Sequence, residues 1–202
     1  MSSSIDVSPI QHIMFLGLEA GELLLYVPYD GSTDVSHDLR AALLRAVMHF
    51  SGDDIRSIRW SNFMYVFEPG EISIAIMGLK VGYDEELYRD KLLKMLSGFE
   101  REYRLAIRQD TGDIRRYKNF ALAVISEMPL VKIALDLVPK SKDGGDPIPW
   151  RVGEVDVKLE ILQQSANGKR TIREIIELTQ MPQEEVIALT SILAYFEWIE
   201  LT

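Results

Sequence analysis

The feature that most constrains the fold is a pair of apolar segments near the start of the chain that do not alternate in polarity. Residues 10–18 and 22–29 are both apolar, and Glu19-Ala20-Gly21 between them predicts a hairpin. Within residues 13–18, apolar side chains occupy odd and even positions alike. Strands that are apolar on both faces belong to a sheet that is covered on both sides. The pattern therefore predicts a layered arrangement of helices and a sheet.

The segments that follow supply the layers of this arrangement. Thr33 or Asp34 precedes an apolar stripe at helical spacing, and Pro69 with Gly70 predicts a turn over residues 68–71. The elements predicted after the hairpin are a helix over 35–50, strands over 55–60, 63–67 and 71–79, a long helix from the cap Asp84 to about Gln109, and a helix over 114–128. This order predicts an α+β fold with a five-stranded, mainly antiparallel sheet and helices on both faces.

Composition divides the chain further. Residues 1–9 predict a flexible tail before a domain over 10–128. Residues 129–153 are rich in proline, glycine and charge, which predicts a linker with a short helical piece near 131–137. Residues 154–202 predict three short helices and a terminal strand, and Thr171 with Glu174 forms a capping-box pattern. This last pattern is typical of a small winged-helix domain.

Charge and residue types exclude several classes of function. The 202-residue chain has a formal charge of −9, which disfavours broad binding to nucleic acid or anionic lipid. Without cysteine it can have no disulfide, thiolate metal site or cysteine nucleophile. No signal peptide, membrane-spanning segment, nucleotide-binding motif, catalytic constellation or metal-ligand spacing is found. We therefore expect a cytoplasmic, non-enzymatic protein without cofactor or metal.

One cluster of positive charge stands out in this acidic chain. Arg101, Arg104 and Arg108 are spaced i, i+3, i+7 on the long predicted helix. After a short break the next helix begins with three more basic residues: Arg115, Arg116 and Lys118. These six side chains are either a solvated face, neutralised in part by nearby acidic residues, or a binding surface for an acidic partner.

The C-terminal domain carries little of the charge that DNA binding requires. Its predicted recognition helix, residues 182–196, contains no lysine or arginine. Residues 154–202 hold four basic against nine acidic residues. Any DNA contact would depend on Lys169, Arg170 and Arg173, so a protein contact is the favoured interpretation.

The strand and helix order over residues 8–128 resembles the longin domain, of the roadblock and longin group. The residues that carry the resemblance are Ile13-Met14-Phe15-Leu16-Gly17-Leu18, Gly21-Glu22-Leu23-Leu24-Leu25-Tyr26 and Phe99-Glu100-Arg101-Glu102-Tyr103. A longin domain followed by a winged helix is similar to nitrogen-permease-regulator-like proteins and to shorter archaeal longin proteins. The resemblance implies a non-enzymatic platform in membrane-trafficking or signalling assemblies, peripheral to membranes only through a partner.

This resemblance also implies partners. A small Ras-like GTPase, or another longin or roadblock protein, is the expected partner, in a homodimer or heterodimer. We expect an open sheet edge at residues 10–18 or 55–60. Some regulators of this kind supply an arginine to a partner GTPase, and Arg56 and Arg59 are the candidates by position. The alternative function is a transcription regulator, with a longin-like sensing or dimerisation domain and a DNA-binding winged helix.

Overall fold

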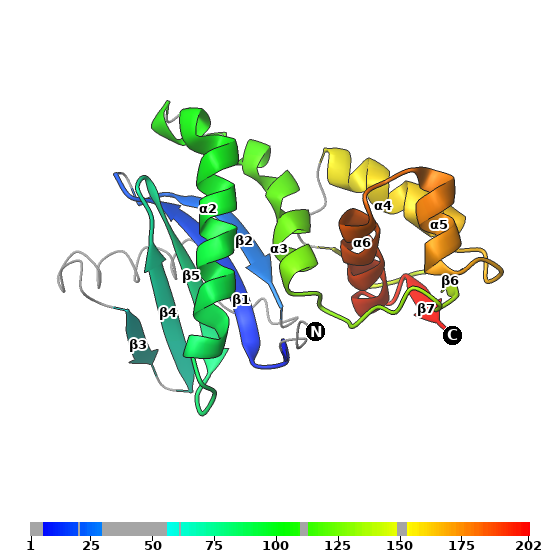
Figure 1. Ribbon diagram of the computed structural model, residues 1–202, viewed down its shortest axis with the longest axis horizontal. Coiled ribbons are helices and arrows are strands. Elements are labelled where there is room, and N and C mark those ends of the chain that lie inside the picture. The colour runs from blue at the N-terminus through cyan, green and yellow to red at the C-terminus, as the bar shows by residue number, and fades with distance from the viewer. Residues whose placement is uncertain (1–5, 20, 30–55, 61, 110–112, 149–152) are drawn as a thin grey trace. The chain divides into compact units, whose positions relative to one another are not determined.

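The computed structural model describes residues 6–19, 21–29, 56–60, 62–109, 113–148 and 153–202. The chain forms two compact units, residues 1–117 and 118–202 (Figure 1). The predicted helix over 35–50 with its Thr33 or Asp34 cap, and most of the predicted tail, lie outside the described residues. Of that tail, residues 6–9 are held in place, because the Tyr88 hydroxyl donates a 2.8 Å hydrogen bond to the Asp6 carbonyl.

The first unit contains one five-stranded sheet in which every neighbouring pair is antiparallel. Its spatial order is β2-β1-β5-β4-β3. The strands are β1 (Ile10–Gly17), β2 (Leu23–Pro28), β3 (Ser57–Trp60), β4 (Phe63–Pro69) and β5 (Ser73–Lys80). The predicted α+β class and the five-stranded antiparallel sheet are therefore confirmed.

Both faces of this sheet are buried, as the non-alternating strands indicate. Every residue of β1 is buried, and β5 is buried except at Lys80. On one face Phe15 of β1 meets Phe99 of the helix α2 (Glu86–Arg108), with ring centroids 4.5 Å apart. The opposite face holds a cluster of buried side chains: Met14, Leu16, Tyr65, Phe67, Ile74 and Ile76.

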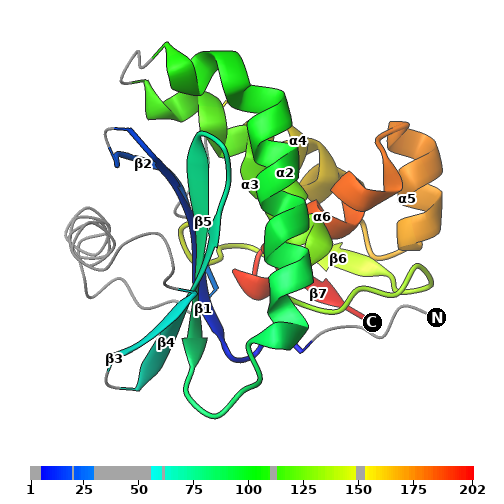
Figure 2. The same cartoon turned by 60° about the vertical axis from the view of Figure 1, so that its left-hand side comes forward.

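Helix α2 lies along one side of the sheet and packs on β5 and β4 (Figure 2). Its buried residues include Leu92, Met95, Leu96 and Phe99, which are members of the stripe expected from the sequence. The Asp84 side chain accepts a 3.1 Å hydrogen bond from the Glu86 N–H, at the point where the helix begins. Glu86 in the first turn and Arg108 in the last both favour the helix dipole.

Three local expectations for residues 10–128 are corrected. Strand β1 is central, between β2 and β5, so residues 10–18 offer no open edge; the ends of the sheet are β2 and β3. The turn predicted at residues 68–71 begins later, because Pro69 still pairs with Ile74 and the Gly70 N–H donates to the Ser73 carbonyl. The helix predicted over 114–128 starts as the 3₁₀ helix η1 (Ile114–Phe120) and becomes α-helical only as α3 (Ala121–Glu127).

The second unit is built from helices with a two-stranded sheet. Helix α3 packs against α6, so it groups with this unit and not with the sheet of the first. The other elements are β6 (Pro139–Ser141), α4 (Glu154–Ser165), α5 (Ile172–Thr179), α6 (Gln183–Tyr195) and β7 (Ile199–Leu201). The helical piece predicted near 131–137 is wrong: the segment has no helix and leads into β6, which pairs with β7. That pairing joins residues far apart in the sequence, which local patterns do not reveal.

The helix starts in this unit follow the sequence closely. The predicted capping box is confirmed: the Thr171 side chain accepts from the Glu174 N–H, and the Glu174 carboxylate accepts from the Thr171 N–H at 2.7 Å. Helix α6 is the most buried helix of the unit, with Val186, Leu189 and Ile192 fully buried. An ion pair of 2.9 Å between Lys158 Nζ of α4 and a Glu185 carboxylate oxygen of α6 adds a polar link.

Candidate functional site

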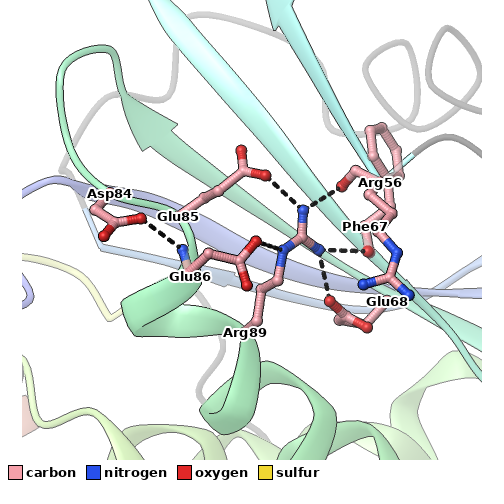
Figure 3. A network of polar contacts seen from close by, with 7 residues as sticks. All are labelled: Arg56, Phe67, Glu68, Asp84, Glu85, Glu86 and Arg89. Carbon is pink, nitrogen blue, oxygen red and sulfur yellow. Dashed lines mark hydrogen bonds and ion pairs between the residues drawn. The ribbon is translucent and has the colours of Figure 1, made fainter.

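The most extensive polar network in the first unit surrounds Arg89, in the first half of α2 (Figure 3). Its guanidinium uses all five N–H donors. Three donate to the carboxylates of Glu68, Glu85 and Glu86, at 2.6, 2.6 and 3.0 Å. The other two donate to the backbone carbonyls of Phe67 at 3.2 Å and Arg56 at 3.0 Å.

This network is structural in character, because every N–H donor of the Arg89 guanidinium is engaged by the protein itself. Arg89 is 6% exposed, and a buried cation is tolerated only when its donors are satisfied. Burial acts to lower the pKa of Arg89, but hydrogen bonds with Glu68 and Glu85 outweigh it and raise the pKa. The guanidinium therefore stays charged and ties α2 to the backbone of β4 and to the segment before β3.

The candidate arginine-finger residues are Arg56, directly before β3, and Arg59, within β3. Arg56 is fixed through its backbone, since its carbonyl accepts from both Arg89 and the Phe67 N–H. Its side chain and that of Arg59, on the terminal strand β3, are exposed. The structure thus places both side chains where a partner could reach them, and shows no chemistry for either.

A second buried charge, Glu100, holds the other half of α2 to the sheet. Its carboxylate accepts from the backbone N–H groups of Glu71, Ile72 and Ser73 at 3.2, 2.9 and 2.9 Å. The Ser73 hydroxyl adds a fourth hydrogen bond of 3.0 Å. Gly70 permits this approach, because a Cβ there would lie 2.2 Å from Glu100 Oε1. Glu100 therefore satisfies the donors of the β4–β5 turn.

Two opposing effects act on the pKa of Glu100. Burial acts to raise the pKa, while the hydrogen bonds from the turn N–H groups and the Ser73 hydroxyl lower it. The hydrogen bonds win, and the pKa lies below its ordinary value. The carboxylate is consequently ionised and bonded at neutral pH.

The sequence analysis did not identify Arg89 and Glu100 as buried, although a signal was present. Positions 89, 92, 96, 100, 103 and 107 recur every three or four residues, so both charges occupy the apolar stripe of α2. A charged residue on a buried stripe requires partners. This signal would have marked both residues as anchors.

Three arginines of the predicted basic cluster belong to α2 and lie outside its buried stripe. Arg101 and Arg108 are exposed, and the Arg104 side chain is 42% exposed. Arg104 forms an ion pair with Glu71, in the β4–β5 turn. No ion pair joins Arg101 or Arg108 to another of the residues that the structure describes.

Helix η1 brings the next basic residues near this end of α2. The Tyr117 ring lies 5.7 Å from Phe99 and 5.3 Å from Tyr103, measured between centroids. Arg115 is exposed and pairs with Asp113, with Nε 2.8 Å from Oδ1. Arg116 is half-buried, and Lys118 belongs to the second unit. Solvated ion pairs therefore account for Arg104 and Arg115, whereas Arg101 and Arg108 form no ion pair within the part of the chain that the structure describes.

A cavity of about 520 Å³ opens beside the last turn of α2. It is formed by the β1–β2 connection, the β4–β5 turn and the last turn of α2. Glu22 and Arg108 line it together with Leu18, Ile72 and Ile107. Its size falls within the usual range for small-ligand sites.

Three basic residues of the second unit lie at the start of α5. Lys169, Arg170 and Arg173 are all exposed. Lys140 of β6 forms a bridge with Asn167, so it lies beside them, and Lys142 follows in the same segment. Sequence reasoning missed these two lysines because it placed them in a linker.

Within the described ranges, no three histidine, aspartate or glutamate side chains are placed to hold a metal ion. None of the helices in that part of the chain combines the length and apolar character needed to cross a membrane. In comparisons with known proteins, no family model and no curated sequence matches the chain.

Proposed function

We propose that the chain is a non-enzymatic interaction module, a longin-like domain followed by a winged-helix-like domain. Its partner is a small Ras-like GTPase or another longin or roadblock protein. The observation that carries the proposal is the sheet of the first unit: two strands, then three, antiparallel, buried on both faces and followed by a long helix. The resemblance implies this order of strands and helix.

The polar groups of the first unit support a binding role over a catalytic one. Two buried charges of the described residues, Arg89 and Glu100, hold α2 to the strands and the turn. The exposed charges of the described residues include arginines on the outer side of α2 and at β3, beside acidic residues such as Asp90 and Glu102. Exposed arginines can contact an acidic partner surface and speed the encounter with it.

The end strands of the sheet offer a second route to a partner. Strands β2 and β3 each pair on one side only within the described sheet. An unpaired strand edge can accept a strand from another chain. We propose that the protein pairs in this way with a second copy or with a related domain.

A binding screen tests the proposal directly. The full chain is immobilised and presented with the small GTPases of its host, each loaded with GDP or with a non-hydrolysable GTP analogue. We expect one GTPase to bind with a preference for one nucleotide state. If none binds in either state, and size-exclusion chromatography with light scattering shows only a monomer, the proposal is wrong.

A bound GTPase also permits a test of the arginine-finger candidates. Its GTP hydrolysis is measured with the wild-type chain and with the Arg56→Ala and Arg59→Ala variants. An arginine finger contributes several orders of magnitude to the rate. A pure binding role predicts that the rate is the same with all three proteins.

A second candidate function, DNA binding by a transcription regulator, is favoured by one observation. Lys140 and Lys142 lie in the segment beside the turn that carries Lys169 and Arg170, which enlarges the basic area of the second unit. Against it, residues 183–195 of α6 contain no lysine or arginine. Binding to duplex DNA that weakens steeply with salt would support this function, and the Lys169→Glu/Arg173→Glu variant should abolish it.

A further inference from the structure

The Glu22 carboxylate in the cavity is held in an unusual position. It lies over Gly17 of β1, where a Cβ would come within 2.3 Å of Glu22 Oε1. Oε2 is shielded from solvent and accepts no hydrogen bond from any residue that the structure describes. A shielded carboxylate oxygen without a donor is unfavourable. Because the two oxygens share one negative charge, a cation at the accessible side of the carboxylate would offset that cost.

A positive charge lines the same cavity. Arg108 lies in the last turn of α2, is exposed, and forms no ion pair with any residue in the described ranges. Glu71, another acidic residue of the lining, is already paired with Arg104. Among the described residues, the cavity thus presents a carboxylate and a guanidinium that form no ion pair with each other or with a third residue.

Apolar groups complete the lining. Leu18 is 41% exposed at the end of β1, and Ile72 and Ile107 contribute from the β4–β5 turn and from α2. A ligand that satisfies the whole surface carries a cationic donor, an anionic acceptor and an apolar body.

We propose that this cavity binds a small zwitterion with an apolar side chain, the chemistry of a free apolar α-amino acid. Glu22 holds the ammonium group, Arg108 holds the carboxylate, and Leu18, Ile72 and Ile107 contact the side chain. Glu19 also lines the cavity, which gives its wall an excess of negative charge and disfavours acidic amino acids. The inference does not depend on the GTPase proposal, and either can fail alone.

Ligand analogues test the inference on the unaltered full chain. Calorimetric titration with L-leucine should show saturable binding. Leucinamide keeps the ammonium group but lacks the carboxylate. N-acetyl-L-leucine keeps the carboxylate but lacks the ammonium group. Each analogue should bind about tenfold more weakly or worse, because a charge-assisted contact is lost.

Two variants assign each charge to its residue. Glu22→Gln should weaken leucine about tenfold and leave N-acetyl-L-leucine unchanged, since that analogue offers no ammonium group. Arg108→Gln should weaken leucine but not leucinamide. Matched controls are Glu102→Gln and Arg101→Gln, because both residues are exposed on α2 and neither lines the cavity.

Three results would overturn the inference. They are the absence of saturable leucine binding, equal binding of leucine and both analogues, or leucine binding that survives in both cavity variants. The analogue experiment uses the wild-type chain, so an unstable variant cannot leave the question open.

Discussion

The two halves of α2 carry arginines in opposite situations. In the first half, the Arg89 side chain is 8% exposed and meets three carboxylates and two carbonyls. In the second half, Arg104 is 42% exposed with one acidic partner, and Arg108 is exposed with none in the described ranges. The same residue type thus serves stability at one end and remains available for binding at the other.

Burial is the cause of this difference. A desolvated guanidinium is tolerated only if every donor is satisfied, so removing it leaves buried acceptors and carboxylates without a partner. An exposed guanidinium is hydrated in the folded and the unfolded state alike, so it contributes little to stability. The comparison therefore predicts large stability effects in the first half of α2 and binding effects in the second.

The largest expected effect is the loss of the Arg89 network. Arg89→Met should lower the free energy of unfolding of the first unit by about 3–5 kcal/mol, because it strands Glu68 and two carbonyls. Urea denaturation followed by circular dichroism measures this change. The matched control, Arg101→Met on the exposed side, should stay within about 0.5 kcal/mol of wild type. Equal losses of unfolding free energy in the two variants would contradict the proposed difference between buried and exposed arginines.

Glu100 tests whether burial, and not position along the helix, determines how much stability is lost when a charged residue of α2 is replaced. Glu100→Gln should destabilise the first unit by about 2 kcal/mol, because an amide group offers one oxygen and adds donors facing the turn N–H groups. Glu102→Gln, the exposed neighbour, serves as the control. A variant as stable as this control would show that the turn does not need the carboxylate.

The same carboxylate predicts a pH dependence. The pKa of Glu100 is lower in the folded chain than its ordinary value of 4.5, so the folded state binds fewer protons than the unfolded state. Its contribution is therefore fully present above about pH 4.5 and is lost as the pH falls through the folded-state pKa. Unfolding free energies measured between neutral and acid pH should fall less steeply in Glu100→Gln than in wild type. Parallel curves would mean that Glu100 does not contribute.

Replacing exposed arginines of α2 should affect stability less than replacing Arg89 or Glu100, but should affect binding more. Arg101→Glu/Arg104→Glu changes two residues outside the cavity and should alter the unfolding free energy by about 1 kcal/mol or less. If this surface meets an acidic partner, the association rate should fall about tenfold at low salt and the difference should shrink as salt increases. Surface plasmon resonance with the partner measures both. An unchanged rate would identify these arginines as a solvated face.

The smallest effect is expected at Arg115. The pKa of Asp113 is lowered by its hydrogen bond with Arg115, yet the side chains of both residues are accessible to solvent. Arg115→Ala should raise the pKa of Asp113 toward its ordinary value of 3.8 and leave the urea midpoint unchanged. Carboxyl resonances followed by NMR through an acid titration measure the pKa. A shifted midpoint would show that the pair supports the fold.

The sequence by itself determined the elements that depend on near neighbours along the chain. Two-faced apolar strands predicted the buried sheet, helical spacing predicted α2, and Thr171 with Glu174 predicted the start of α5. These signals are local, because a strand face repeats every two residues and a helix face every three or four. The solvent side of α2, with Arg101 and Arg108, follows from the same periodicity.

Only the tertiary structure decided how distant segments meet. Arg89 finds Glu68 across 21 residues and Glu100 finds Ser73 across 27, so no local pattern could name those partners. The central place of β1, the pairing of β6 with β7 and the cavity beside Glu22 arise in the same way. The physical reason is that a buried polar group must be satisfied by whatever the fold brings within hydrogen-bonding distance, and chain separation does not limit that choice.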